Sequence, residues 1–103
     1  MAPPHLTAEQ RAQALEKAVL ARRKRAEIKQ LLKTGSLSLA RLLEEAEEDP
    51  LVAGIKVSAV LASMPRTGKI KSKRLMEKLG IAENRRIRGL GERQRAALLE
   101  EFS

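Results

Sequence analysis

Only one aromatic side chain, Phe102, is available to fill the interior of this chain of 103 residues. Because Trp, Tyr and Cys are absent, a core must be built from Leu, Ile, Val, Ala and Met. Such a core suits small packed helices, and the length suits one compact domain. The lack of cysteine also excludes a disulfide framework, a thiolate metal site and a cysteine nucleophile.

The chain opens with the signals of one long helix. Thr7 stands at an N-cap position, and Gln10 three residues later completes a capping-box pattern. Gly35 supplies a C-terminal stop, so the pattern predicts a helix that runs to about Thr34. At 1.5 Å per residue its length is roughly 40 Å.

The apolar residues of this helix do not keep to one stripe. Leu15 and Val19 share a face, whereas Ile28 and Leu32 lie well round the helix from it. We therefore expect the second half of the helix to pack on the domain and the first half to project. This divides the chain into an extended basic helix at 1–34 and a domain at 35–103.

About four short helices are expected after the long one. Ser38 and Asp49 stand at N-cap positions, and Pro65 ends the segment that Asp49 begins. Two further helices are predicted at about 69–79 and 92–102. The expected core contacts of the short helices are Leu39, Leu42, Leu43, Ala46, Val57, Val60, Leu61, Met64, Ile70, Leu75, Met76, Leu79, Leu98, Leu99 and Phe102.

Charge is distributed unevenly along the chain. Residues 1–34 carry a net charge of +5, residues 35–64 carry −3, residues 65–95 carry +8 and residues 96–103 carry −2. Two basic blocks thus flank an acidic centre, which predicts a polarised surface. The basic run 22–25 covers a full helical turn, so part of it must face away from the core, either as solvated surface or as a phosphate contact.

Two glycine turns, at 65–69 and 88–91, each feed a predicted helix in the strongly basic third of the chain. A helix start exposes N–H groups with positive partial charge, and glycine lets the backbone approach a ligand. Ordinary turn glycines are the plain alternative. Because 11 basic residues fall within 65–95, we interpret the turns as phosphate sites of a nucleic-acid clamp.

Other patterns in the sequence indicate no further chemistry. The acidic run 44–49 has no converging histidine, and the single His5 is expected at the surface. Few aromatic residues disfavour modules that stack bases, so backbone contacts to duplex DNA are favoured. No apolar run approaches the ~20 residues of a membrane span. We expect no enzyme activity, cofactor, metal, small-molecule substrate or membrane contact.

Segments 57–73 and 85–91 resemble the integration host factors of actinobacteria. Segments 6–11, 14–18 and 98–102 are also similar to that family, so the resemblance covers nearly the whole chain. It implies an all-α fold with a long N-terminal helix followed by a compact helix-two-turns-helix DNA-binding domain. It also implies a cytoplasmic, nucleoid-associated protein that binds duplex DNA with little sequence preference, bends or compacts it, and supports site-specific integration.

The resemblance implies that the turn at 66–69 contacts the DNA backbone and that the arginines at 85, 86 and 88 contact a groove or phosphates. The full set of expected DNA contacts is Arg66, Thr67, Gly68, Lys69, Lys71, Lys73, Arg74, Arg85, Arg86, Arg88, Gly89, Gly91 and Arg93. A secondary set on the long helix is Arg22, Arg23 and Arg25.

The first glycine turn departs from a related pattern. The helix-hairpin-helix turn reads Pro-Gly-hydrophobic-Gly, whereas Arg66 and Thr67 take the middle places here. Loss of the first glycine is expected to distort the turn; alternatively, Arg66 adds a charge and Thr67 adds a hydroxyl donor to a phosphate. The intact turn at 89–91 is therefore the safer phosphate site.

Two other functions are consistent with a basic helical chain of this size. A DNA-repair glycosylase or lyase uses related hairpins, but about a dozen residues after Gly91 leave no room for a catalytic helix. An RNA-binding protein of the ribosomal type remains the alternative to duplex DNA binding. In either case we expect a monomer in solution.

Overall fold

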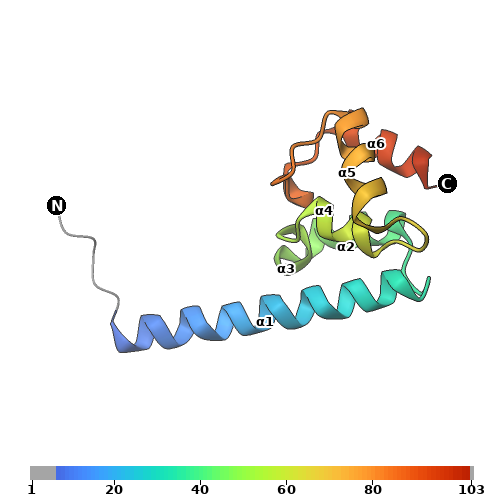
Figure 1. Cartoon of the computed structure of the whole chain (residues 1–103). Helices are drawn as coiled ribbons and strands as arrows, with labels where there is room; N and C mark the ends of the chain where they lie inside the picture. The colour runs from blue at the N-terminus through green and yellow to red at the C-terminus, as the bar shows by residue number, and fades with distance from the viewer. Residues whose placement is uncertain (1–6, 103) are drawn as a thin grey trace.

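The computed structural model describes residues 7–102, in which a long helix, α1 (Ala8–Lys33), runs beneath a cluster of short helices (Figure 1). Thr7 caps α1: its hydroxyl accepts from the N–H of Gln10, and the Gln10 side chain accepts from the N–H of Thr7, both at 3.0 Å. Gly35 follows the helix with φ +76°, a conformation that glycine adopts without strain. The expected capping box and long helix are thus confirmed, while His5 lies outside the described residues.

Only the second half of α1 is seated in the core. Ile28 and Leu32 are 2% and 0% exposed, whereas between Ala8 and Glu27 all side chains are exposed except the partly shielded Ala21 and Lys24. In Figure 1 the first half of α1 accordingly extends away from the short helices. Side chains of α1 and of the short helices share one core. The predicted division of the chain into units at 1–34 and 35–103 is not tested by this packing and stays a prediction.

Five short α-helices and one 3-10 turn follow α1 in the described part of the chain. They are α2 (Leu39–Glu48), α3 (Pro50–Ala53), α4 (Val57–Ser63), α5 (Gly68–Leu79), the 3-10 turn η1 (Ile87–Gly89) and α6 (Glu92–Glu101). The number exceeds the expected four because Gly54 ends α3 and an extended residue, Lys56, precedes α4. Ser38 and Asp49 cap α2 and α3 as predicted, accepting from the N–H groups of Arg41 and Leu51.

The core is aliphatic and centres on α4, which contacts both α1 and α5. Buried hydrophobic residues are Ile28, Leu32, Leu37, Leu39, Leu42, Leu43, Val52, Ile55, Val57, Val60, Leu61, Met76, Ile81, Ile87 and Leu98. Ala46, Met64, Leu75, Leu79, Leu99 and Phe102 pack against them and are partly buried. The predicted core is therefore confirmed with one exception.

The prediction for Ile70 is wrong, because this side chain is 72% exposed. Ser72 and Met76 face the core from α5, at 3% and 2% exposure, and Ile70 lies nearly opposite Ser72 on the helix. The Ser72 hydroxyl donates to the carbonyl of Ser58 at 3.4 Å, so small side chains bring α5 close to α4. This close approach sets the rotation of α5 and turns Ile70 outward.

The segment after α5 is fixed by an antiparallel backbone bridge between Lys56 and Arg86. The N–H of Val57 donates to the carbonyl of Arg85 at 2.9 Å, and the N–H of Ile87 donates to the carbonyl of Ile55 at 3.0 Å. The helical periodicity gave no sign of this contact. It anchors the arginine-rich connector to the turn between α3 and α4.

Ion pairs tie the helices together at the surface. Glu47 of the acidic run pairs with Arg95 across α2 and α6 at 3.2 Å, and Asp49 pairs with Lys24 of α1 at 3.7 Å. Glu101 accepts a hydrogen bond from Lys78 at 2.7 Å, which raises the pKa of that ammonium group, as does the charge of the Glu101 carboxylate. The acidic run thus joins elements of the fold.

Truncation of Leu61 and of Ile70 tests this account of the core. Leu61 is 0% exposed, so Leu61→Ala is expected to lower the free energy of unfolding by about 2–5 kcal/mol. Ile70→Ala is expected to change it by less than about 0.5 kcal/mol. Urea denaturation followed by circular dichroism measures both, and equal losses would place Ile70 in the core.

Candidate nucleic-acid interface

The turn before α5 has the backbone geometry of an anion site. Arg66 and Gly68 have φ of +63° and +67°, and Thr67 between them is right-handed helical. A right-handed residue followed by a left-handed one turns successive N–H groups toward one point. No side chain caps the start of α5, so the first N–H groups of the helix and its dipole face outward.

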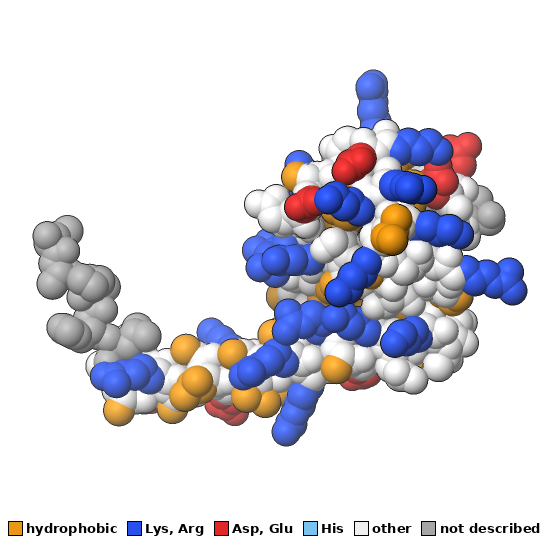
Figure 2. All heavy atoms as spheres, in the orientation of Figure 1, with side chains coloured by type: hydrophobic (Ala, Val, Ile, Leu, Met, Phe, Trp, Pro, Cys, Tyr) orange, Lys and Arg blue, Asp and Glu red, His pale blue; other side chains and the backbone are white. Residues whose placement is uncertain are grey.

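Cationic side chains lie on this turn and on the first half of α5. Lys71 donates from Nζ to the carbonyl of Arg66 at 3.3 Å, and Lys73 pairs with Glu83 at 3.8 Å. Arg66, Lys69 and Arg74 are exposed. Figure 2 shows Lys and Arg side chains grouped on this face of the domain.

The Thr67 hydroxyl is engaged within the turn itself. It donates to the carbonyl of Pro65 at 3.4 Å, and the N–H of Thr67 donates to the carbonyl of Met64 at 3.2 Å. Of the two roles expected for the altered turn, the added charge of Arg66 is therefore the better supported one.

The arginines of the connector bond to the backbone. Arg85 donates from one terminal nitrogen to the carbonyl of Gly89 at 2.6 Å, and Arg86 donates to the carbonyl of Gly54. A Cβ at Gly89 would stand 2.9 Å from Cδ of Arg85, so a larger residue there would require the Arg85 side chain to shift. The Arg85 side chain therefore closes the connector onto η1, and the Arg86 side chain ties the connector to the α3–α4 turn. The contact of both arginines with DNA stays a prediction.

At the second glycine turn, as at the first, no side chain caps the first N–H groups of the helix that follows, here α6, although the N–H of Gly91 itself is engaged. The N–H of Gly91 donates to the side-chain oxygen of Gln94 at 3.0 Å, and the Gln94 side chain donates to the carbonyl of Gly80 at 3.1 Å. The turn also rests on different helices, since η1 packs on α2 and α3 whereas α5 packs on α4 and α6. Both helix starts therefore lack a side-chain cap, and the choice between the two turns as phosphate sites stays a prediction.

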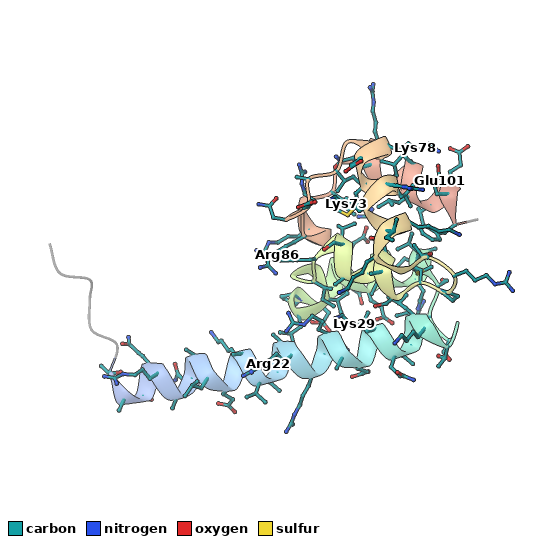
Figure 3. All side chains as sticks on the ribbon, viewed as in Figure 1. Arg22, Lys29, Lys73, Lys78, Arg86 and Glu101 are labelled. Atoms are coloured by element: carbon teal, nitrogen blue, oxygen red, sulfur yellow. The ribbon has the colours of Figure 1, made fainter. Side chains whose placement is uncertain are left out.

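The remaining expected contacts lie on the surface. Arg88 and Arg93 are exposed near η1 and at the start of α6. On α1, Arg22, Arg23 and Arg25 are exposed, and Nε of Arg22 donates to the carbonyl of Ala18 at 3.4 Å. Figure 3 places Arg22 on α1 and Arg86 on the domain above it.

A groove of about 970 Å³ lies between α1, α4 and α5. Five lysines line it among the described residues: Lys29, Lys33, Lys56, Lys69 and Lys73. The sequence predicted DNA contacts for Lys69 and Lys73 and assigned no role to the other three. Lys29 and Lys33 directly follow the core residues Ile28 and Leu32, and this adjacency is the signal that sets them beside the domain.

Other kinds of site are not supported in the part of the chain that the structure describes. Within residues 7–102, no three His, Asp or Glu side chains gather to hold a metal ion. No helix in this range has the length and apolarity needed to cross a membrane.

Comparison with known proteins identifies the family. A family model described as an S13-like H2TH domain matches residues 32–102. The integration host factors of Mycobacterium tuberculosis and Mycolicibacterium smegmatis are each 55% identical over 102 residues, covering 99% of this chain and 97% of theirs. That of Streptomyces coelicolor is 52% identical, covering 99% of this chain and 95% of its own.

The chain belongs to the integration host factor family. A solved structure described as sIHF bound to an 8-base-pair palindromic DNA is 48% identical, with a TM-score of 0.82. It covers 85% of this chain and 99% of its own. Membership confirms the expected resemblance, the all-α helix-two-turns-helix fold and the expectation that the protein is not an enzyme.

Arg66 offers a test that separates backbone strain from charge in this family member. A left-handed residue other than glycine costs roughly 1–2 kcal/mol, so Arg66→Gly is expected to raise the free energy of unfolding by about 0.5–1 kcal/mol. Arg66→Ala removes the same charge and keeps the Cβ, so it is expected to leave stability unchanged. Thermal denaturation compares the two, and equal stability of both variants would contradict the strain.

Proposed function

We propose that the chain is a nucleoid-associated architectural protein that binds duplex DNA largely without sequence preference. It acts in the cytoplasm as a monomer, bends or compacts DNA, and supports site-specific integration. Binding is directed at backbone phosphates, and arginine side chains enter the minor groove. No cofactor, metal or small-molecule substrate takes part.

The observation that carries this proposal is the uncapped start of α5. The N–H groups after Thr67 and the positive end of the α5 dipole favour an anion there. The exposed cations Arg66, Lys69 and Arg74 add attraction for a polyanion rather than for a single small anion. A duplex presents such a row of phosphates, which makes it the fitting partner.

The relatives support the same partner. The solved neighbour with a TM-score of 0.82 carries DNA, and its 48% identity extends over 85% of this chain. The only aromatic residue, Phe102, packs against the core, so stacking on bases contributes little and the contacts are to the backbone. Sequence-independent binding follows from contacts of this kind.

Salt dependence tests the electrostatic mechanism. With about six phosphate contacts, log K plotted against log salt concentration is expected to have a slope of about −5. Fluorescence anisotropy with a labelled random-sequence duplex measures the slope. Affinity that does not change with salt would exclude phosphate-dominated binding.

The arm of α1 provides a second test. Arg23→Gln together with Arg25→Gln removes two exposed charges from the arm and is expected to make the salt slope shallower by about 2. Arg41→Gln together with Lys78→Gln is the matched control, since these side chains pair with Glu44 and Glu101 elsewhere on the surface. Equal slopes for the two variants would remove the arm from the interface.

RNA binding is the alternative, because the matching family model is described as S13-like. An A-form helix offers phosphates to the same turn but presents a wide, shallow minor groove. Competition between an unlabelled DNA duplex and a structured RNA decides between them. Stronger competition by the RNA would replace duplex DNA as the partner.

A further inference from the structure

We propose that the groove between α1, α4 and α5 holds one phosphodiester strand of the bound duplex. This inference rests on the proposed function and adds a site made by Lys29, Lys33 and Lys56, none of which the sequence assigned. The groove has a volume of about 970 Å³. Figure 3 shows Lys29 on α1 where the helix passes the domain and Lys73 on α5 above it.

The two walls of the groove carry matching pairs of cations. Lys29 and Lys33 stand four residues apart on α1, and Lys69 and Lys73 stand four residues apart on α5. Residues at this spacing lie on one face of a helix, about 6 Å apart along its axis. That separation is comparable with the distance between neighbouring phosphates of one nucleic-acid strand. Each wall therefore presents two ammonium groups at the spacing of two successive phosphates.

The floor of the groove is small and electrically neutral. It is formed by Ser58, Ala59, Ala62 and Ser63 of α4, with Ser72 of α5 beside them. The hydroxyls of Ser63 and Ser72 donate to the carbonyls of Ala59 and Ser58 at 2.8 and 3.4 Å, so they are engaged within the protein. The short side chains of the floor leave room for a nucleic-acid strand. Because the floor hydroxyls are engaged, the lysines of the walls are the groups that contact its phosphates.

The positive charge of the groove favours a polyanion as its ligand. Five lysines face one carboxylate among the described residues that line it, that of Glu83, which pairs with Lys73 at 3.8 Å. Four exposed ammonium groups therefore repel one another unless anions lie between them. A phosphodiester strand supplies one negative charge per nucleotide and neutralises both walls at once.

The groove is continuous with the anion site at the start of α5. Gly68 and Lys69 belong both to the uncapped turn and to the groove lining. A strand whose phosphate sits on the turn can therefore run on between α1 and α5 without leaving the positive surface. This continuity identifies the occupant as the same duplex that the turn binds.

Lysine footprinting on the full chain tests the site. The protein is acetylated with and without a random-sequence duplex, and modification of each lysine is followed by mass spectrometry. Lys29, Lys33, Lys56 and Lys69 are expected to react severalfold more slowly with DNA present, while Lys78 at the far end of α5 reacts equally in both. Protection of Lys69 without protection of the other three would contradict strand binding in the groove but would remain consistent with the proposed DNA-binding function.

A charge-matched pair of variants provides the second measurement. Lys29→Gln with Lys33→Gln is expected to weaken duplex binding roughly tenfold at moderate salt and to reduce the salt slope by about 2. The control, Arg41→Gln with Lys78→Gln, loses the same net charge outside the groove and is expected to keep the wild-type slope. Identical salt slopes for the Lys29/Lys33 variant and the Arg41/Lys78 control would contradict strand binding in the groove. Failure of the wild-type protein to bind duplex DNA would contradict the proposed function itself.

Discussion

The packing of α4 between α1 and α5 is the constraint on which the rest of the molecule depends. Val60 and Leu61 are 1% and 0% exposed, and they fill the space between the two longer helices. Close approach of α5 to α4 requires small side chains between them. Ser72 meets this requirement, because its hydroxyl donates to the backbone of α4. This one arrangement sets the rotation of α5, seats α1 and leaves a basic groove along the line where the three helices meet.

Local signals were enough to predict most of the fold. Caps at Thr7, Ser38 and Asp49 and the stop at Gly35 act within a few residues, so they can be read from the sequence. The membership in the integration host factor family agrees with what those signals indicated. By contrast, Ile70 was expected in the core because its side chain is apolar, whereas its outward position depends on which face of α5 meets α4.

The site was harder to predict, because its residues are brought together by tertiary contacts. The bridge between Lys56 and Arg86 and the bond from the Arg86 side chain to the carbonyl of Gly54 join segments far apart in the chain, whose pairing no local pattern encodes. Arg86, which the sequence predicted as a DNA contact, therefore also stabilises the fold. Likewise Lys56 and Lys29, far apart in the chain, share a groove only after α1 and α4 have packed. Charge counts located the basic surface in the sequence but not its shape in space.

The exposed half of α1 has a consequence for how the molecule melts. From Ala8 to Glu27 the helix buries almost nothing, so apart from the ion pair of Lys24 with Asp49 its hydrogen bonds are supported by its capping box and its own side chains. Most helical stability in proteins comes from packing of an apolar face, so a helical segment that packs on nothing opens with a lower free energy than a packed core. The arm and the core therefore belong to different cooperative units. Far-UV ellipticity will decline gradually while the arm frays, before the core unfolds in one step, and a single transition temperature describes only the second event.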